Sequence, residues 1–507
     1  MNKQDFLKTI KARSEFWGFF WEICQIPRSS GREGGVVEYL VDFAEKNELP
    51  YFRDENDNLI IYKDNGSEET IGLQAHMDMV CEKTQGSRHD FLLDPIALVV
   101  EGDFISAKDT TLGADNGIGI AYILAVLSME NKDFVNLECV FTVSEESDMS
   151  GVRGLDFSRI SAGRMISFDA FCETDIIIGS ASANGWIAEM PVEYMVDENV
   201  VATYEVFAEG FPGGHSGADI HDEARGNPIG EIVRILKGLG SGVRLNGARS
   251  NDDGQMNSIP TSFWAEISFV GDLGLLGKIG GDLKGLRDRF SGSEVGLRKI
   301  GVNNRVLDGR SYDKFLDFVA NYRCGACREV NTNEISANLG FARLGEDSLE
   351  LAFSMRANDE KCEAARLEEI ERSMAKNGVV ARKVVEIPAA NQTFVNGFLE
   401  EVAEKYEEVF GVAPVVGRAN ICLEWSFFAQ NIPDLEFLTI APNIFDAHSV
   451  GERLSVGSGE RIFGVLVGVL QNVGFVASFS DHKHLSGPKH LDGQKSSTRK
   501  LPVWNIL

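Results

Sequence analysis

The first 185 residues of this 507-residue chain alternate between helical and strand patterns, and this alternation limits the possible folds more than any other feature. Residues 31–49 repeat apolar side chains at helical spacing, and residues 116–129 form a longer apolar helix pattern. Short apolar runs that are typical of buried strands lie between and after them, at 58–63, 70–80, 137–146 and 164–170. Helices that alternate with strands favour a layered sheet covered by helices, so we predict an α/β fold class.

The pattern changes from about residue 186, where strands with alternating apolar and polar side chains become more frequent. A chain of this length is also too long for one compact core, so we expect more than one domain. We predict a first α/β segment over 1–185, an α+β domain over 186–388, and a return to the first domain over 389–480. Residues 481–507 are polar with little periodicity, and we predict that they form a tail.

The chain is acidic, with 77 Asp and Glu residues against 49 Lys and Arg residues and a formal net charge of −28. Such a surface repels nucleic-acid phosphates and anionic membranes, so neither is an expected partner. The N-terminal residues are mixed and charged, unlike a signal peptide, and no uncharged apolar run reaches the ~18 residues of a membrane helix. We therefore expect a cytoplasmic protein, in which the eight scattered cysteines stay reduced.

His76 and Asp78 lie at the end of an apolar strand in the stretch LQAHMDMVCEK. Side chains alternate along a strand, so residues two apart project from the same face. An imidazole and a carboxylate would therefore lie together at one edge of a sheet. This pair is compatible with a metal site, with a catalytic pair, or with the solvated end of an ordinary strand.

Five further acidic or histidine residues occur where strands end or in the turns that follow them. They are Asp115, Glu145, Glu146, Asp169 and His448. Ligands of open α/β sheets bind outside the carboxyl ends of the strands, so these side chains are candidates for a single site. Each has another explanation by itself: Asp115 and Asp169 as helix or turn caps, the glutamate pair as a solvated loop, and His448 as a surface histidine.

Carboxylates and imidazoles without thiolates suit zinc, cobalt or manganese. Two divalent ions ~3.5–4 Å apart need a group with two oxygens, or a shared water, to bridge them. Adjacent residues at a strand end point apart, so one of Glu145 and Glu146 can bind metal while the other reaches the bridging water as a general base. Asp78 would orient the imidazole of His76 and raise its basicity.

Five motifs in this chain occur in the order that is found in one enzyme family. They are LQAHMDMVCEK, TTLGADNGIGIA, TVSEESDMSGVRGLD, FPGGHSGADIHDEARGNPI and FDAHSVGERLSV. Over roughly residues 10–478 the chain resembles the aminoacyl-histidine dipeptidases, the cytosolic Xaa-His dipeptidase branch of the aminoacylase/carboxypeptidase-like zinc peptidases. The resemblance implies a catalytic domain with a central mixed sheet flanked by helices, interrupted by an α+β lid domain.

The resemblance also implies two zinc ions in each chain, with cobalt or manganese as alternatives. His76, Asp115 and Asp169 would hold one ion, and Asp115 would bridge to the second ion, held by Glu146 and His448. Glu145 would be the general base. Family members carry a cis peptide bond after the bridging aspartate, which corresponds here to the bond between Asp115 and Asn116.

In the lid, the resemblance assigns His215 to polarisation of the scissile carbonyl, often from the partner subunit, and Arg356 to binding of the substrate carboxylate. The expected activity is hydrolysis of dipeptides, of the Xaa-His type and more broadly, by a water that bridges two metals. A small peptide substrate and a homodimer are the expected partners. Asn420 stands where the family usually has a histidine. An amidohydrolase of N-acyl amino acids or other short peptides, and an inactive binding or scaffold protein, remain the alternatives.

Overall fold

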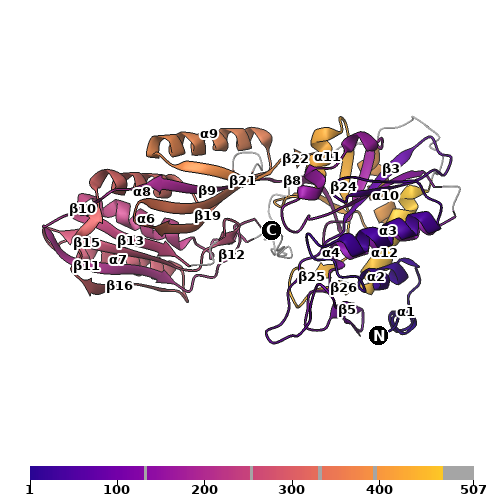
Figure 1. The fold of residues 1–507 in the computed structure, drawn as a ribbon, viewed down its shortest axis with the longest axis horizontal. Helices are drawn as coiled ribbons and strands as arrows, with labels where there is room; N and C mark the ends of the chain where they lie inside the picture. Colours follow the sequence, from indigo (N-terminus) through magenta and orange to yellow (C-terminus); the bar gives the residue numbers. More distant parts are fainter. Residues whose placement is uncertain (131–133, 218, 252–254, 329–333, 392–396, 472–507) are drawn as a thin grey trace, which may run out of the picture.

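The computed structural model describes residues 1–130, 134–217, 219–251, 255–328, 334–391 and 397–471. The predicted tail at 481–507 lies outside these residues. Two bodies lie side by side along the long axis of the molecule (Figure 1), each with its own sheet and its own hydrophobic cluster. We call the body that contains both ends of the described chain the core domain, and the body formed by the residues between 182 and 387 the inserted domain.

The core domain is built on a nine-stranded mixed sheet. In spatial order its strands are β1 (Tyr51–Arg53), β2 (Leu59–Lys63), β6 (Asn136–Thr142), β3 (Thr70–His76), β7 (Arg164–Ser167), β24 (Glu436–Thr439), β8 (Asp175–Ser180) and β22 (Ala390–Asn391), and β23 (Val415–Ala419) pairs with β8. Strands β6, β3, β7 and β24 run parallel to one another, whereas β1, β2 and β22 pair antiparallel with their neighbours. The predicted α/β class with a mixed sheet is confirmed.

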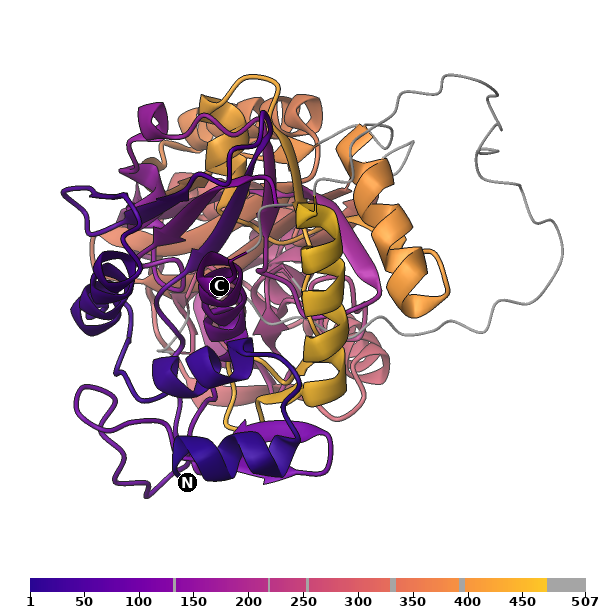
Figure 2. The same cartoon turned by 90° about the vertical axis from the view of Figure 1, so that its right-hand side faces the viewer.

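Helices enclose this sheet, and α4 is the most deeply buried of them because its sequence is apolar on every side. The helices of the core domain are α1 (Lys3–Ile10), α2 (Phe16–Ile23), α3 (Gly34–Lys46), α4 (Ala114–Ser128), α5 (Ser150–Arg153), α10 (Gly397–Phe410), α11 (Trp425–Asn431) and α12 (Val456–Leu470). Phe16, Tyr122 and Phe463 stack together where α2, α4 and α12 meet. Burial of each such ring contributes roughly 1.5–3 kcal/mol, which fixes α4 against the sheet. Figure 2 shows α10 and α12 side by side.

A small four-stranded sheet lies beside these helices. Its strands are β25 (Ile444–Phe445), β26 (Arg453–Ser455), β5 (Phe104–Ala107) and β4 (Leu98–Glu101). Strand β26 leads directly into α12, and the segment between β25 and β26 contains His448. In the described part of the chain, no helix is long and apolar enough to cross a membrane.

The inserted domain has a second nine-stranded sheet in which every pairing is antiparallel. Its strands in spatial order are β16 (Glu294–Gly301), β11 (Val200–Glu209), β15 (Phe263–Val270), β13 (Val243–Ser250), β19 (Glu334–Leu344), β20 (Ser348–Ala357), β9 (Ser182–Pro191) and β21 (Val380–Ile387), and β18 (Gly325–Arg328) pairs with β19. Its helices are α6 (Pro228–Leu239), α7 (Leu276–Arg289), α8 (Gly309–Asn321) and α9 (Glu360–Asn377). Two short pairs complete it: β10 (Tyr194–Val196) with β17 (Arg305–Leu307), and β12 (Gly214–His215) with β14 (Ser258–Ile259).

The inserted sheet is an internal repeat. One half consists of β11, α6, β13, β15, α7 and β16, and the other of β9, α8, β19, β20, α9 and β21, so both follow the order strand, helix, two strands, helix, strand. The two halves meet where β13 pairs with β19. Outward from this pairing, the strands of each half lie in the same order, namely the second, third, first and fourth strand of that half. The first half is inserted in the sequence between β9 and α8 of the second.

The chain crosses between the two sheets twice, and both crossings lie together. Strand β8 ends at Ser180 and β9 begins at Ser182, while β21 ends at Ile387 and β22 begins at Ala390. Ala390 pairs with Ser180 in the core sheet, and Ile387 pairs with Ala183 in the inserted sheet. The predicted domain limits at 186 and 388 remain a prediction, and β9 begins before the first of them.

Candidate metal centre

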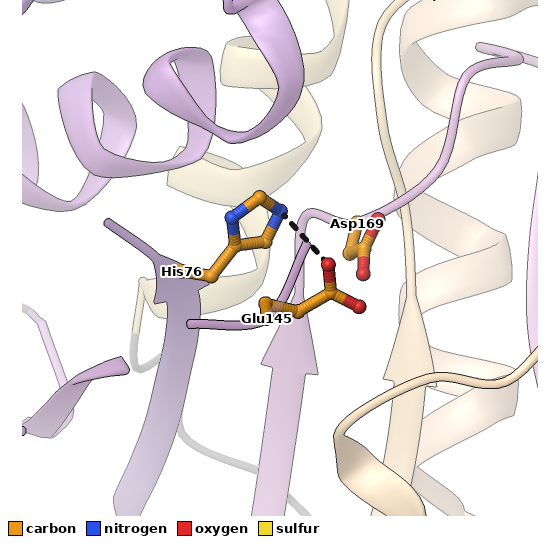
Figure 3. A group of neighbouring side chains, drawn as sticks. All are labelled: His76, Glu145 and Asp169. Carbon is orange, nitrogen blue, oxygen red and sulfur yellow. Dashed lines mark ion pairs between the residues drawn. The ribbon is translucent and has the colours of Figure 1, made fainter. Parts of the chain in front are cut away.

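The parallel strands of the core sheet place three of the predicted residues at one edge. His76 is the last residue of β3, the glutamate pair follows β6 after two residues, and Asp169 follows β7 after one. Because β3 runs parallel to both β6 and β7, their carboxyl ends coincide. Figure 3 shows the side chains of His76, Glu145 and Asp169 converging there, with His76 Nε2 at 4.0 Å from Glu145 Oε2.

Asp115 lies between two histidines. Its Oδ1 is 3.0 Å from Nε2 of His76, and its Oδ2 is 3.0 Å from Nε2 of His448. It occupies the first turn of α4, where the backbone is not helical at Asp115 and Asn116, and the peptide bond between them is cis. One carboxylate therefore presents a different oxygen to each imidazole, which is the arrangement that a bridging ligand requires.

The predicted site residues form two overlapping groups that could hold a metal ion, and one of them includes Glu145, the predicted general base, in place of Asp115. Ligand atoms of His76, Glu145 and Asp169 lie within 4.8 Å of one another, and so do those of His76, Asp115 and Glu146. His448 joins the second group, with Nε2 at 3.1 Å from Oε1 of Glu146. All five predicted metal ligands and the predicted general base are thus brought together from five separate segments.

Asp78 holds this arrangement from behind. Its Oδ1 lies 3.3 Å from Nδ1 of His76 and accepts the backbone N–H of Glu145 at 3.1 Å. Its Oδ2 accepts the backbone N–H of Glu146 at 3.0 Å and the hydroxyl of Ser30 at 2.7 Å. One fully buried carboxylate therefore orients the His76 ring and both glutamates. Sequence reasoning predicted its contact with His76 but not its contact with the glutamate backbone.

The imidazoles and the carboxylates perturb one another strongly. Burial by itself would lower the pKa of His76, but the carboxylates of Asp115 and Asp78 raise it well above its ordinary value. Burial also opposes the charge on Asp115, yet His448 and His76 lower the pKa of this carboxyl below its ordinary value. Asp115 is therefore anionic at neutral pH.

The two histidines lower the pKa values of the remaining carboxylates, but burial outweighs this effect. Burial, followed by the negative charge of Asp169, raises the pKa of Glu145 well above its ordinary value. Burial and the charge of Asp115 raise the pKa of Asp169 in the same way, and burial raises the pKa of Glu146. Nearby divalent cations would reverse all three effects because they favour the ionised form.

The donor atoms fit such cations. Glu145 Oε1 and Glu146 Oε2 are buried and have no hydrogen-bond partner among the described residues. Buried carboxylate oxygens are normally paired or bound to a metal, because an unpaired one is costly. Imidazole nitrogens and carboxylate oxygens without a thiolate match zinc, cobalt or manganese, so the residues present fit two ions.

The inserted domain brings its two predicted residues toward this centre. Arg356 lies near the end of β20, is buried, and donates from Nη1 to Sγ of Cys422 in the core domain at 3.0 Å. His215 lies in β12, where burial and the charges of Arg356 and His448 lower its pKa to about 2. His215 is therefore neutral at physiological pH. It lies close to the metal centre of its own chain.

Asn420, the departure from the family pattern, connects the two domains. Its Nδ2 donates to the carbonyl oxygen of Gly217 at 3.3 Å and lies 3.1 Å from Nε2 of His221. Gly217 and His221 belong to the same loop as His215. The residue at position 420 therefore contacts the segment that places His215 near the centre.

Glu452 is a site residue that the sequence analysis missed. Its carboxylate is buried and accepts the backbone N–H groups of Leu112 at 2.7 Å, Gly113 at 2.9 Å and Ala114 at 2.8 Å. The Arg28 guanidinium donates to the carbonyl oxygen of Gly113 from the other side. This turn comes directly before Asp115, so Glu452 positions the candidate bridging ligand. The available signal was its spacing of four residues from His448.

We expect Glu452→Ala to destabilise the metal-free protein by at least about 3 kcal/mol, because three buried N–H groups lose a charged acceptor. Urea denaturation measures this change. Glu452→Gln keeps one acceptor oxygen and should lose less stability than the alanine variant. A change below about 1 kcal/mol for the alanine variant would show that the turn holds its shape without Glu452.

Glu424 forms a second buried network under the centre. Its Oε2 accepts from Nε2 of Gln74 at 2.7 Å and from the hydroxyl of Thr142 at 2.5 Å. Its Oε1 is buried with no hydrogen-bond partner among the described residues. Burial raises the pKa of Glu424 from 4.5 to about 7, despite the positive charge of His76.

This raised pKa makes stability depend on pH in a defined direction. The folded state favours the protonated form of Glu424. Its contribution to the free energy of unfolding is therefore fully present below the unfolded pKa of 4.5 and is lost as the pH rises through about 7. We expect Glu424→Gln to raise the free energy of unfolding by about 3 kcal/mol at pH 8 and to change it little at pH 4. Thermal unfolding of metal-stripped protein at both values measures this difference. Glu400→Gln, on the exposed side of α10, should follow the parent chain at both.

Comparison with known proteins identifies the family of this chain. Residues 72–472 match the model of peptidase family M20/M25/M40. Among characterised proteins, the chain is 27% identical over 471 residues to the cytosol non-specific dipeptidase of Escherichia coli (strain K12), covering 90% of this chain and 97% of that protein. Among solved structures, it superimposes on aminoacylhistidine dipeptidase from Vibrio alginolyticus with a TM-score of 0.80 and 24% identity, covering 90% of this chain and 96% of that one.

A more distant match is aminopeptidase PepT from Bacillus cereus ATCC 10987, with a TM-score of 0.53 and 14% identity over 93% of this chain and 98% of that one. At these identities the structural matches establish the fold alone. The family match is broader in meaning, because it spans most of the chain and includes every residue of the centre from His76 to His448. It confirms the expected class of enzyme, a hydrolase of peptide bonds. The chain belongs to peptidase family M20/M25/M40.

Proposed function

We propose that this chain is a dipeptidase that uses two divalent metal ions, preferably zinc, and acts on Xaa-His and other dipeptides. The observation that carries the proposal is Asp115, whose two oxygens each lie 3.0 Å from a different histidine. His76 and Asp169 would hold one ion, Glu146 and His448 the other, and Asp115 both. The named activities of the relatives in Escherichia coli and Vibrio alginolyticus support the choice of dipeptides.

The bound ions would lower the pKa of a water molecule and polarise the scissile carbonyl. Glu145 is buried at the centre, so we assign it the proton of that water and its later transfer to the leaving amine. The neutral His215 is a hydrogen-bond donor for the carbonyl oxygen as negative charge develops on it. Arg356 would bind the substrate carboxylate through its guanidinium.

The test is hydrolysis of a dipeptide panel by metal-stripped protein refilled with zinc, cobalt or manganese. We expect free amino acids from the refilled protein and none from the stripped protein. N-acetyl amino acids in the same assay test the nearest alternative, an amidohydrolase, and faster cleavage of these compounds would favour it. Absence of any product with every metal would favour an inactive binding protein.

Two further properties belong to this proposal. We propose that the enzyme works in the cytoplasm, as the name of the Escherichia coli relative states for that protein. We also propose a homodimer, following the resemblance, and light scattering of the purified chain tests it.

A further inference from the structure

A cavity of about 430 Å³ lies where the inserted domain meets the core domain. This volume is within the ~300–1,000 Å³ range of small-molecule pockets. Strands β9, β20 and β21 contribute from the inserted domain, and residues 147–149 contribute from the core domain. Those core residues directly follow Glu145 and Glu146 in the sequence, and the predicted substrate-binding residue Arg356 also lines the cavity.

The floor of the cavity is one face of β9 and β20. Ser354 pairs with Gly185, and Ala352 pairs with Ile187, at alternate positions along the two strands. Side chains at alternate positions share a face, so all four belong to the same surface, and Ala183 continues it. Three of these five residues are glycine or alanine. These small residues allow the side chains of Met256 and Val385 to pack closely over Gly185.

The other face of the same strands is filled. Trp186 of β9 stacks on Phe353 of β20 with ring centroids 5.3 Å apart, and both belong to the hydrophobic cluster of the inserted domain. These packed rings hold β9 and β20 in place from the face opposite the cavity. Such a surface keeps its shape when a ligand side chain enters.

Most of the surface that lines the cavity is apolar, although Asn184, Gln255 and Asn257 also contribute to it. Met149 of the core domain is fully buried, and Met256, Val385 and Ile187 of the inserted domain also line the cavity. The charged side chains at its rim, Asp148 and Arg153, belong to exposed residues. Methionine side chains adapt to ligands of different shape, so these walls favour apolar groups of several kinds.

Arg356 marks one end of this floor. It pairs with Ala183 and lies on the same face as Ser354 and Ala352, two and four residues earlier on β20. Its guanidinium also contacts Cys422, another residue that lines the cavity. The C-terminal residue of a dipeptide carries its carboxylate and its side chain on the same α-carbon. If Arg356 binds this carboxylate, the side chain reaches the floor beside Arg356.

We propose that this cavity receives the C-terminal side chain of the dipeptide and selects large apolar residues, such as leucine, methionine and phenylalanine. This inference rests on the proposed dipeptidase function. Each buried methylene group in an apolar pocket changes kcat/KM by roughly 10-fold or more. A neutral histidine side chain fits less well than leucine, and an aspartate side chain is rejected because its charge would be buried without a partner.

The experiment compares Ala-Leu, Ala-His, Ala-Gly and Ala-Asp as substrates of the zinc-loaded full chain. We expect kcat/KM for Ala-Leu to exceed that for Ala-Gly by about 10-fold or more and that for Ala-Asp by at least about 100-fold. Absence of cleavage of all four would refute the proposed function itself. Cleavage of all four with equal kcat/KM would overturn only the assignment of the cavity.

Two variants connect the preference to the cavity. Ala352→Leu places bulk on the floor and should lower kcat/KM for Ala-Leu about 10-fold while Ala-Gly is cleaved as before. Ile187→Ser removes an apolar side chain from the floor at a half-exposed position that tolerates substitution. It should reduce the ratio of kcat/KM for Ala-Leu to kcat/KM for Ala-Gly. The control is Val380→Ser, at an exposed position on β21 outside the cavity, which should change neither ratio. An unchanged ratio in Ile187→Ser would overturn the proposal even if Ala352→Leu did not fold.

Discussion

Glu145→Gln is expected to lower kcat for dipeptide hydrolysis by about 1,000-fold or more with little change in KM. A general base contributes roughly 10²–10⁴-fold to such reactions, and glutamine has the same size but cannot accept the proton. The carboxylate is buried at the centre, where its Oε2 lies 4.0 Å from Nε2 of the metal-ligand candidate His76. Steady-state kinetics on a dipeptide, with metal content measured in parallel, checks the expectation.

The matched control removes a carboxylate far from the centre. Glu400→Gln, on α10, should keep the kcat of the parent chain. Metal content separates two causes of failure, because an inactive Glu145→Gln chain that still binds two ions has lost only the base. Activity of Glu145→Gln within about tenfold of the parent chain would remove Glu145 from the mechanism.

Asp115→Asn is expected to abolish activity for a different reason, the loss of bound metal. The asparagine keeps one oxygen but carries no charge, so it cannot offset the repulsion between two cations. Loss of a residue that only supports a metal ligand already costs about 10–100-fold in affinity, and loss of a bridging ligand should cost more. Metal analysis after dialysis should therefore find one ion or fewer in each chain, against two in the parent.

The comparison with Asp78→Asn sharpens this expectation. Asp78 contacts His76 and the backbone of both glutamates, but it is not in either group of candidate ligands. Its loss should weaken metal binding by about 10–100-fold and leave two ions bound when metal is in excess. If Asp115→Asn also bound two ions under those conditions, Asp115 would not be the bridge.

Local patterns were sufficient to predict the part of the centre that depends on strand ends. The predicted strand at 70–80 places His76 and Asp78 on one face, although β3 ends at His76 and Asp78 follows it. The parallel pairing of β3 with β6 and β7 brings the glutamates and Asp169 to the same edge. The order of helices and strands predicts that edge, because helical crossovers favour parallel strands.

Contacts between distant segments could not be predicted in this way. Glu452 accepts from a turn that lies more than three hundred residues earlier, and Glu424 accepts from Gln74 and Thr142 across a similar separation. Nothing in the local sequence of a buried glutamate names its partner, because only the packed fold brings the two together. The repeat within the inserted domain was also missed, since one copy interrupts the other in the sequence.

That repeat has a consequence for how the enzyme can change over evolutionary time. His215 belongs to one copy and Arg356 to the other, so in the proposed mechanism each copy would supply a different group to the same reaction. In a symmetric dimer every substitution appears in both subunits, and a surface cannot be altered on one side alone. Here both copies are encoded separately in one chain. The half that carries Arg356 can therefore adapt the floor of the cavity to new substrates while the half that carries His215 stays unchanged.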